Sequence, residues 1–177
     1  MNKPTQFLVL AAILLFCHSA IAGWDANAEK SASEAIAAFK EKDPKLQSFF
    51  DKAHGYAVFA SVGKAGIGIG GAHGSGVVYE KGKAIGTTTL TQLTIGFQLG
   101  GQVYSEIIFF KDKAALDRFT KGQFELGAQA SAVAVTAGAS ANVDYSNGVA
   151  IFTMAKGGLM YEASVGGQKF SYEPIAK

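Results

Sequence analysis

Apolar and small residues follow a helical spacing in the N-terminal part of the chain. Within residues 25–52 they recur every three or four positions, as Ala28, Ala32, Ala35, Ile36 and Phe39. Asp43 and Pro44 then begin a new segment, because aspartate caps helix N-termini and proline fits the first helical position. The pattern therefore predicts two consecutive helices.

From residue 55 to residue 173 the spacing changes to a period of two, which is typical of β-strands. The clearest alternation runs over residues 92–103, where Leu, Ile, Phe and Val alternate with Gln, Thr and Gly. We expect one long amphipathic strand there, continued by or paired with residues 104–110. Further strands are predicted at residues 56–62, 76–79, 84–89, 124–136, 149–154, 159–164 and 169–173, with turns at residues 80–83, 146–148 and 156–158.

One helix is predicted inside the β-region. Asp112 is its candidate N-cap, Gly122 can end it, and its apolar face consists of Ala115, Leu116 and Phe119. Short turns favour antiparallel pairing, and many of the 22 glycines fall inside strand patterns, which indicates bulges and sharp bends. We expect an α+β fold: a curved antiparallel sheet or partly closed β-barrel, with the N-terminal helices and the inserted helix packed on one side.

The first 22 residues have the three parts of a secretory signal peptide. Lys3 provides the positive start, residues 7–16 are an unbroken run of ten apolar residues, and residues 20–22 form a small-x-small cleavage site. The apolar run is too short for a transmembrane helix, which needs roughly 20 residues. We expect cleavage after Ala22 and a periplasmic or secreted location.

Cleavage leaves a single domain over residues 23–177 and removes the one cysteine, Cys17. The processed protein then has no thiol for a disulfide, a nucleophile or a metal. Lipidation of Cys17 is the alternative, which Phe16 disfavours because a small residue is required before a lipidated cysteine. With 16 basic and 14 acidic residues, the chain lacks the broad basic field that nucleic acid would require.

Catalytic and cofactor signatures are missing from the sequence. Residues 66–71 match the spacing of dinucleotide-binding glycines, but no helical pattern follows and residues 84–105 contain no acid. His54, at a helix-to-strand junction, and His73, on a predicted loop, lack the partners of a zinc site. The sequence neither shows nor excludes a pair of catalytic carboxylates at distant positions. We expect a non-enzymatic protein without metal or cofactor.

Lysines are the candidate binding residues. Four lie in or between the N-terminal helices, near Phe39, Phe49 and Phe50, and two lie in the predicted hairpin turn at residues 80–83. The six are Lys40, Lys42, Lys45, Lys52, Lys81 and Lys83. Basic residues beside aromatic ones can seat a helix on an anionic lipid surface. The alternative is an ordinary solvated face, since neighbouring acids dilute the charge.

Several segments of the β-region together resemble the SYLF domain family. These are GYAVF at residues 55–59, the glycine series at 66–71, GFQLG at 96–100 and FELGAQASA at 124–132. The resemblance extends over residues 49–172. SYLF domains are known as lipid-binding modules, and eukaryotic members bind phosphoinositides and in some cases actin. The resemblance implies the fold of this family and an affinity for anionic phospholipid headgroups.

Two elements of the eukaryotic members are missing. Where they carry Trp-Ser-x-Pro, residues 87–91 read TTTLT, and where they carry Gly-Pro-x-Gly-Arg, residues 137–140 read AGAS. The chain looks like a secreted bacterial branch, so neither actin nor phosphoinositide is expected as its physiological ligand. The resemblance implies a periplasmic module that touches anionic phospholipid through basic residues. The alternative is an outer-membrane-associated or self-assembling β structural protein of the cell envelope.

Overall fold

In the computed structural model the described residues are 26–67, 69–95, 100–127, 130–157 and 163–175, so the predicted signal peptide lies outside them. The helical segments are α1 (Ala26–Lys42), η1 (Pro44–Leu46), α2 (Gln47–Lys52), α3 (Lys113–Thr120) and η2 (Ala139–Asn142). The strands are β1 (Gly55–Ile67), β2 (Ile69–Glu80), β3 (Lys83–Ile95), β4 (Gly100–Phe110), β5 (Ser131–Ala134), β6 (Val149–Gly157), β7 (Ala163–Ser164) and β8 (Gln168–Pro174).

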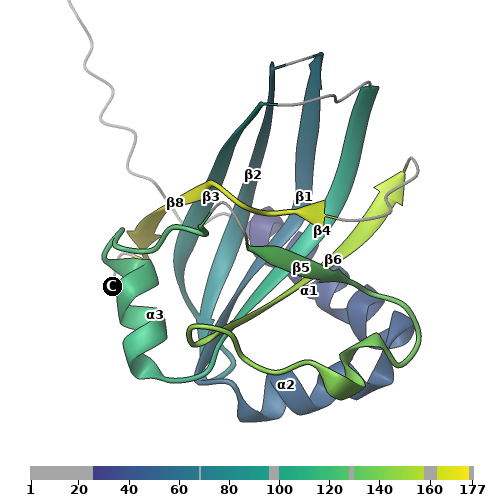
Figure 1. Cartoon of the computed structure of the whole chain (residues 1–177). Helices are drawn as coiled ribbons and strands as arrows, with labels where there is room; N and C mark the ends of the chain where they lie inside the picture. Colours follow the sequence, from purple (N-terminus) through teal and green to yellow (C-terminus); the bar gives the residue numbers. More distant parts are fainter. Residues whose placement is uncertain (1–25, 68, 96–99, 128–129, 158–162, 176–177) are drawn as a thin grey trace, which may run out of the picture.

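The strands form one curved sheet in the order β7-β5-β6-β4-β1-β2-β3-β8 (Figure 1). Pairing is antiparallel throughout the described strands except between β5 and β6, which run parallel. The two end strands, β7 and β8, do not pair with each other. The predicted α+β class and curved sheet are confirmed, but the sheet stays open and no barrel forms.

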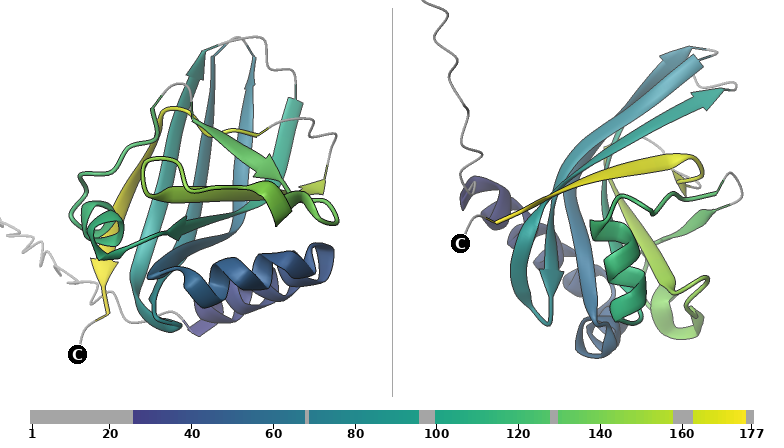
Figure 2. Two further views of the ribbon diagram at one scale, coloured as in Figure 1. Left: turned by 60° about the horizontal axis from the view of Figure 1, so that its bottom comes forward. Right: turned by 90° about the vertical axis from the view of Figure 1, so that its left-hand side faces the viewer.

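Helices lie on both faces of the sheet, and each strand contributes to both cores because its neighbouring residues point to opposite sides. Tyr56 and Val58 of β1 pack with the apolar side chains of α1 and α2. Ala57 and Phe59 belong to a second core with α3 and β8. Figure 2 shows α1 and α3 on different sides of the sheet. The prediction that all helices share one side is therefore wrong.

The long strand predicted at residues 92–103 is also wrong. β3 ends at Ile95 and β4 begins at Gly100, and β1 and β2 separate these strands in the sheet. Residues 96–99 lie outside the described residues. Polar and apolar residues still alternate within each strand. The polar side is the buried one, however, since Gln92 is buried and Leu93 is 73% exposed. Period two does not reveal a change of direction, and it does not say which face is covered.

The C-terminal part differs in the extent of its strands. Of the strand predicted at residues 124–136, the described residues 124–127 and 130–136 form only β5, with an isolated bridge between Glu125 and Lys169 before it. The strands predicted at residues 149–154 and 169–173 are confirmed as β6 and β8. Most of the strand predicted at 159–164 lies outside the described residues, apart from β7.

Two of the three predicted turns have the backbone that their sequences favour, whereas the turn predicted at residues 156–158 is wrong, since residues 156 and 157 continue β6. Lys81 and Gly82, between β2 and β3, both have positive φ values of 49° and 77°. Asn147 and Gly148 repeat this geometry before β6, with φ of 51° and 83°. Two positive φ values are typical of the tight turn that matches the twist of antiparallel strands. Both turn predictions are therefore confirmed.

Gly76 illustrates why a strand of this sheet contains glycine. A β-carbon at Gly76 would lie 2.6 Å from the carbonyl oxygen of Val58 and 2.8 Å from the ring of Phe59. The pairing of β1 with β2 shifts register between Val58 and Ser61, next to this contact. The glycine thus lets β2 approach a bulge in β1, as a strand glycine commonly does.

Asp43 fixes the corner between α1 and α2. Its carboxylate accepts hydrogen bonds from the backbone N–H of Lys45, at 3.1 Å, and of Ser140 in η2, at 2.8 Å. Asp43 is fully buried. The predicted N-cap is therefore confirmed, and it also ties the helical corner to a segment 97 residues later in the chain.

We expect Asp43→Ala to lower the free energy of unfolding by about 2 kcal/mol, because two buried backbone donors lose their acceptor. Asp112→Ala is the matched control, since Asp112 caps α3 through Ala115 but lies at the surface, and about 1 kcal/mol is expected there. Urea denaturation measures both values. Equal losses would contradict the tertiary role of Asp43.

Candidate functional surfaces

The six predicted lysines lie around the N-terminal helices and the β2–β3 turn. Lys42, Lys45 and Lys52 are exposed, and the ammonium of Lys40 sits 4.4 Å from the ring centroid of Phe50. Such a cation–π contact holds the side chain against the helix. The set Lys40, Lys42, Lys45, Lys52, Lys81 and Lys83 is called the basic edge below.

The turn lysines adjoin the end of α2. The backbone N–H of Lys81 donates to the carbonyl of His54, at 3.1 Å, two residues beyond Lys52. The same junction holds an acid, since the ring nitrogen Nε2 of His54 lies 2.9 Å from a carboxylate oxygen of Glu80. The predicted position of His54 is confirmed, and the basic edge carries mixed charge where Glu80 and Asp51 adjoin it.

An exposed apolar surface lies at the opposite end of the sheet. Leu93 of β3, Ile69 of β2 and Val103 of β4 are 73%, 67% and 41% exposed, respectively. We call these three residues the apolar tip. Sequence reasoning placed Leu93 and Val103 on one apolar strand face without predicting that this face is uncovered. The lack of charge over residues 84–105 was the available signal.

Glycines form the floor between the side chains of the apolar tip. In the strand register Leu93 faces Gly71, Gly71 faces Ala65, and Ala65 faces Gly101. The adjoining row runs from His73 through Gly63 to Val103. A shallow hollow of about 640 Å³ opens over these rows. His73 is exposed on β2, so its predicted loop position is wrong.

A buried polar cluster lies beneath β8 on the other face. Glu106 is fully buried and accepts a hydrogen bond from the amide of Gln168 at 3.0 Å. Burial raises the pKa of Glu106 to about 7, while the bond from Gln168 and the charge of Lys64 oppose this rise. Burial and the neighbouring Glu106 also raise the pKa of Tyr104. One carboxylate oxygen of Glu106 has no hydrogen-bond partner among the described residues.

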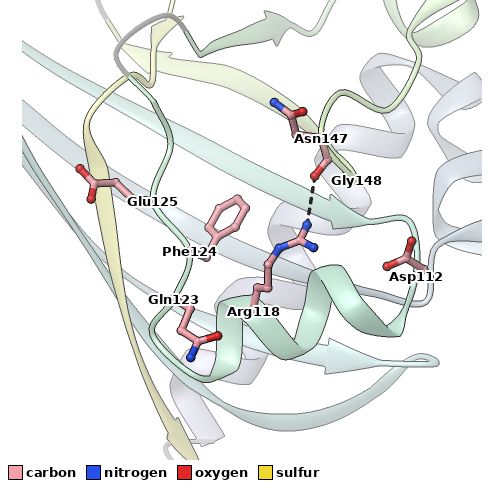
Figure 3. A pocket seen from close by; sticks show the side chains of 7 residues that line it. All are labelled: Asp112, Arg118, Gln123, Phe124, Glu125, Asn147 and Gly148. Carbon is pink, nitrogen blue, oxygen red and sulfur yellow. Dashed lines mark hydrogen bonds between the residues drawn. The ribbon is translucent and has the colours of Figure 1, made fainter.

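A separate hollow lies between α3 and the turn before β6 (Figure 3). Its charged centre is Arg118, whose guanidinium donates to the carbonyl of Asn147 at 3.2 Å. Asp112 and Glu125 also line the hollow, and Asp112 already caps α3. The acidic residues disfavour an anion here, and the seven lining residues include neither a histidine nor a hydroxyl nucleophile.

No group of three or more His, Cys, Asp and Glu side chains in the described part of the chain is placed to hold a metal ion. Among the same residues, no helix has both the length and the apolar character needed to cross a membrane.

The fold defines a small α+β domain with an open curved sheet, and both candidate surfaces lie on its exterior. Residues 91–174 match the model of the Ysc84 family, described as Las17-binding protein actin regulator. This family is also the SYLF family, so the resemblance seen in the sequence is confirmed over residues 91–174. The matched range includes Leu93 and Val103 of the apolar tip, whereas all six lysines of the basic edge precede it.

A curated relative is beta cell expansion factor A of Aeromonas veronii. It is 30% identical over 141 residues, which cover 78% of this chain and 53% of that protein. The chain thus spans about half the length of this relative.

Proposed function

We propose that this chain is a non-enzymatic lipid-binding module of the cell envelope, secreted or periplasmic after cleavage behind Ala22. It contacts anionic phospholipid headgroups through the basic edge. The observation that carries the proposal is the row of exposed lysines along the corner of α1 and α2, with Lys40 held over Phe50. The family match supports lipid binding in general. Neighbouring acids keep the affinity modest.

Replacement of Lys40, Lys42 and Lys45 by alanine tests this contact. Each lysine near an anionic surface contributes about 1 kcal/mol, so the triple variant should bind on the order of 100-fold more weakly. Co-sedimentation of the processed protein with neutral and anionic phospholipid vesicles, at low and high salt, measures the effect. Wild-type protein should bind anionic vesicles in a salt-sensitive manner.

The control replaces Lys30, Lys111 and Lys121 by alanine, which removes the same charge from exposed positions outside the basic edge. Near-wild-type binding is expected of this control. Equal weakening of both variants would mean that net charge, and not the basic edge, governs binding. A lack of vesicle binding by soluble wild-type protein would contradict the proposed function and direct attention to protein partners.

A further inference from the structure

We propose that the apolar tip is a second lipid contact, which inserts into the apolar boundary region of a bilayer independently of the basic edge. The inference rests on the proposed function, because it takes the protein to a membrane surface. It differs from that function in the residues used and in the force, which is apolar burial rather than charge. Its occupant is a phospholipid bilayer.

The exposed side chains of the apolar tip share one face of the sheet. Leu93 on β3 faces Gly71 on β2, and Ile69 lies two residues from Gly71, so both share one face of the sheet. The adjacent pair, Gln92 and Ala72, is buried on the other face, so Leu93 and Ile69 point to the side that carries α1. Val103 lies on the same face of β4, next to buried Tyr104. Large exposed aliphatic side chains grouped on one projecting end are a feature of interaction sites.

The glycine floor leaves this face open. A β-carbon at Gly63 would meet no atom within 4 Å, and one at Gly101 would meet only the carbonyl oxygen of Lys64 at 3.9 Å. Packing within the domain therefore does not require glycine at either position. The resulting hollow, lined by Val103, His73 and the glycines between them, has room for an apolar chain.

The charges around the apolar tip complement an anionic lipid surface. Within the described residues 61–67, 69–75, 89–95 and 100–103 no acid occurs, and the one formally charged residue, Lys64, lies in the row of Ala72 and Gln92 on the opposite face. Exposed Lys156 of β6 lies beside Val103, because its neighbours Gly157 and Ala155 pair with Val103 and Tyr104. Lysines at the margin of an apolar surface extend to the headgroups while the apolar part is buried.

The two contacts lie at opposite ends of the sheet. β2 leads from Ile69 at the apolar tip to Glu80 beside Lys81, and its 12 residues span about 40 Å. Contact through the apolar tip should resist salt, whereas contact through the basic edge should not. Salt therefore separates the two contacts in one experiment.

The test compares wild-type protein with the double variant Ile69→Asp, Leu93→Asp in co-sedimentation with anionic phospholipid vesicles at about 0.5 M salt, where exposed charges are screened. We expect at least about tenfold weaker binding by the double variant, because two apolar side chains no longer enter the lipid. Both positions are exposed, so thermal melting should be unchanged. Equal binding by both proteins at high salt would overturn the proposal.

A second measurement locates the lipid directly. The variant Trp24→Phe, Leu93→Trp places the only tryptophan at the apolar tip, and Trp24→Phe, Lys83→Trp places it at the basic edge. Vesicles with brominated acyl chains should quench the fluorescence at position 93 and not at position 83. Undiminished low-salt binding by the variant with Lys40, Lys42 and Lys45 replaced, together with quenching at position 93, would refute the basic edge and leave the apolar tip standing.

The remaining outcomes oppose the inference. If wild-type protein binds vesicles but the brominated lipid does not quench the variant with tryptophan at position 93, the proposed function stands and the apolar tip is overturned. Sedimentation equilibrium detects a competing occupant, a second copy of the chain. If the Asp variants convert a dimer to a monomer without altering vesicle binding, the apolar tip is a self-association surface, and the lipid contact is refuted.

Discussion

Phe109→Ala is expected to lower the free energy of unfolding by about 3–5 kcal/mol, which is much of the stability of a typical domain. Phe109 is fully buried on β4. Its ring centroid lies 4.8 Å from that of Phe50, 5.4 Å from Phe49 and 5.8 Å from Phe152. Truncation would leave a cavity where α2 meets the sheet, and the backbone of β4 is held between β1 and β6 and cannot fill it.

Guanidinium denaturation, followed by circular dichroism, measures this loss. Leu93→Ala removes an apolar side chain of similar class from an exposed position, and a change within about 0.5 kcal/mol is expected there. Phe109→Leu keeps most of the buried volume and should fall between the two. A loss below about 1 kcal/mol for Phe109→Ala would mean that α2 is not packed on the sheet as described.

Glu106 should make the protein less stable as the pH rises. Burial raises its pKa from 4.5 to about 7 in the folded state. Between these values the folded protein keeps a proton that the unfolded chain has released, so the free energy of unfolding falls with increasing pH. For one group this difference amounts to about 3 kcal/mol over the interval from about pH 4.5 to pH 7. The burial of Glu106 is thus most costly at alkaline pH.

Glu106→Gln should remove this contribution. The variant is expected to gain stability relative to wild type as the pH rises from about 4.5 to about 8, because the amide cannot ionise. Urea denaturation at several pH values measures the difference between the two proteins. Glu125→Gln, at an exposed position, should leave the profile parallel to wild type. A constant difference between wild type and Glu106→Gln would show that the folded pKa is not raised.

Local patterns predicted the elements whose signals are local. The cap at Asp43, the cap at Asp112 and the turn at Lys81 and Gly82 were all predicted from adjacent residues, and the structure forms each with the expected backbone. Hydrogen bonds over two or three positions specify these features, so the sequence nearby contains the required information.

Features that depend on distant partners were not predictable in the same way. The reversal between β3 and β4 follows from both strands pairing around the β1–β2 hairpin, which no window of residues reveals. The exposure of Leu93 depends on where α1 stops covering the sheet. In the sequence nothing distinguishes Glu106 from the other thirteen carboxylates, because its partner Gln168 lies 62 residues later in the chain. The predicted lysines were placed individually, but their charge balance depends on acids brought close by folding.

The pairing of β3 with β8 sets the order in which this sheet can be completed. Their partners, from Gln92 with Gln168 to Gly86 with Pro174, are 76 to 88 positions apart in the chain. Closing so long a loop carries an entropic cost before any contact forms, which slows folding. During synthesis, the edge of β3 that pairs with β8 stays unpaired until β8 has been made. A chain of this topology therefore completes its sheet only after its C-terminal residues have been made.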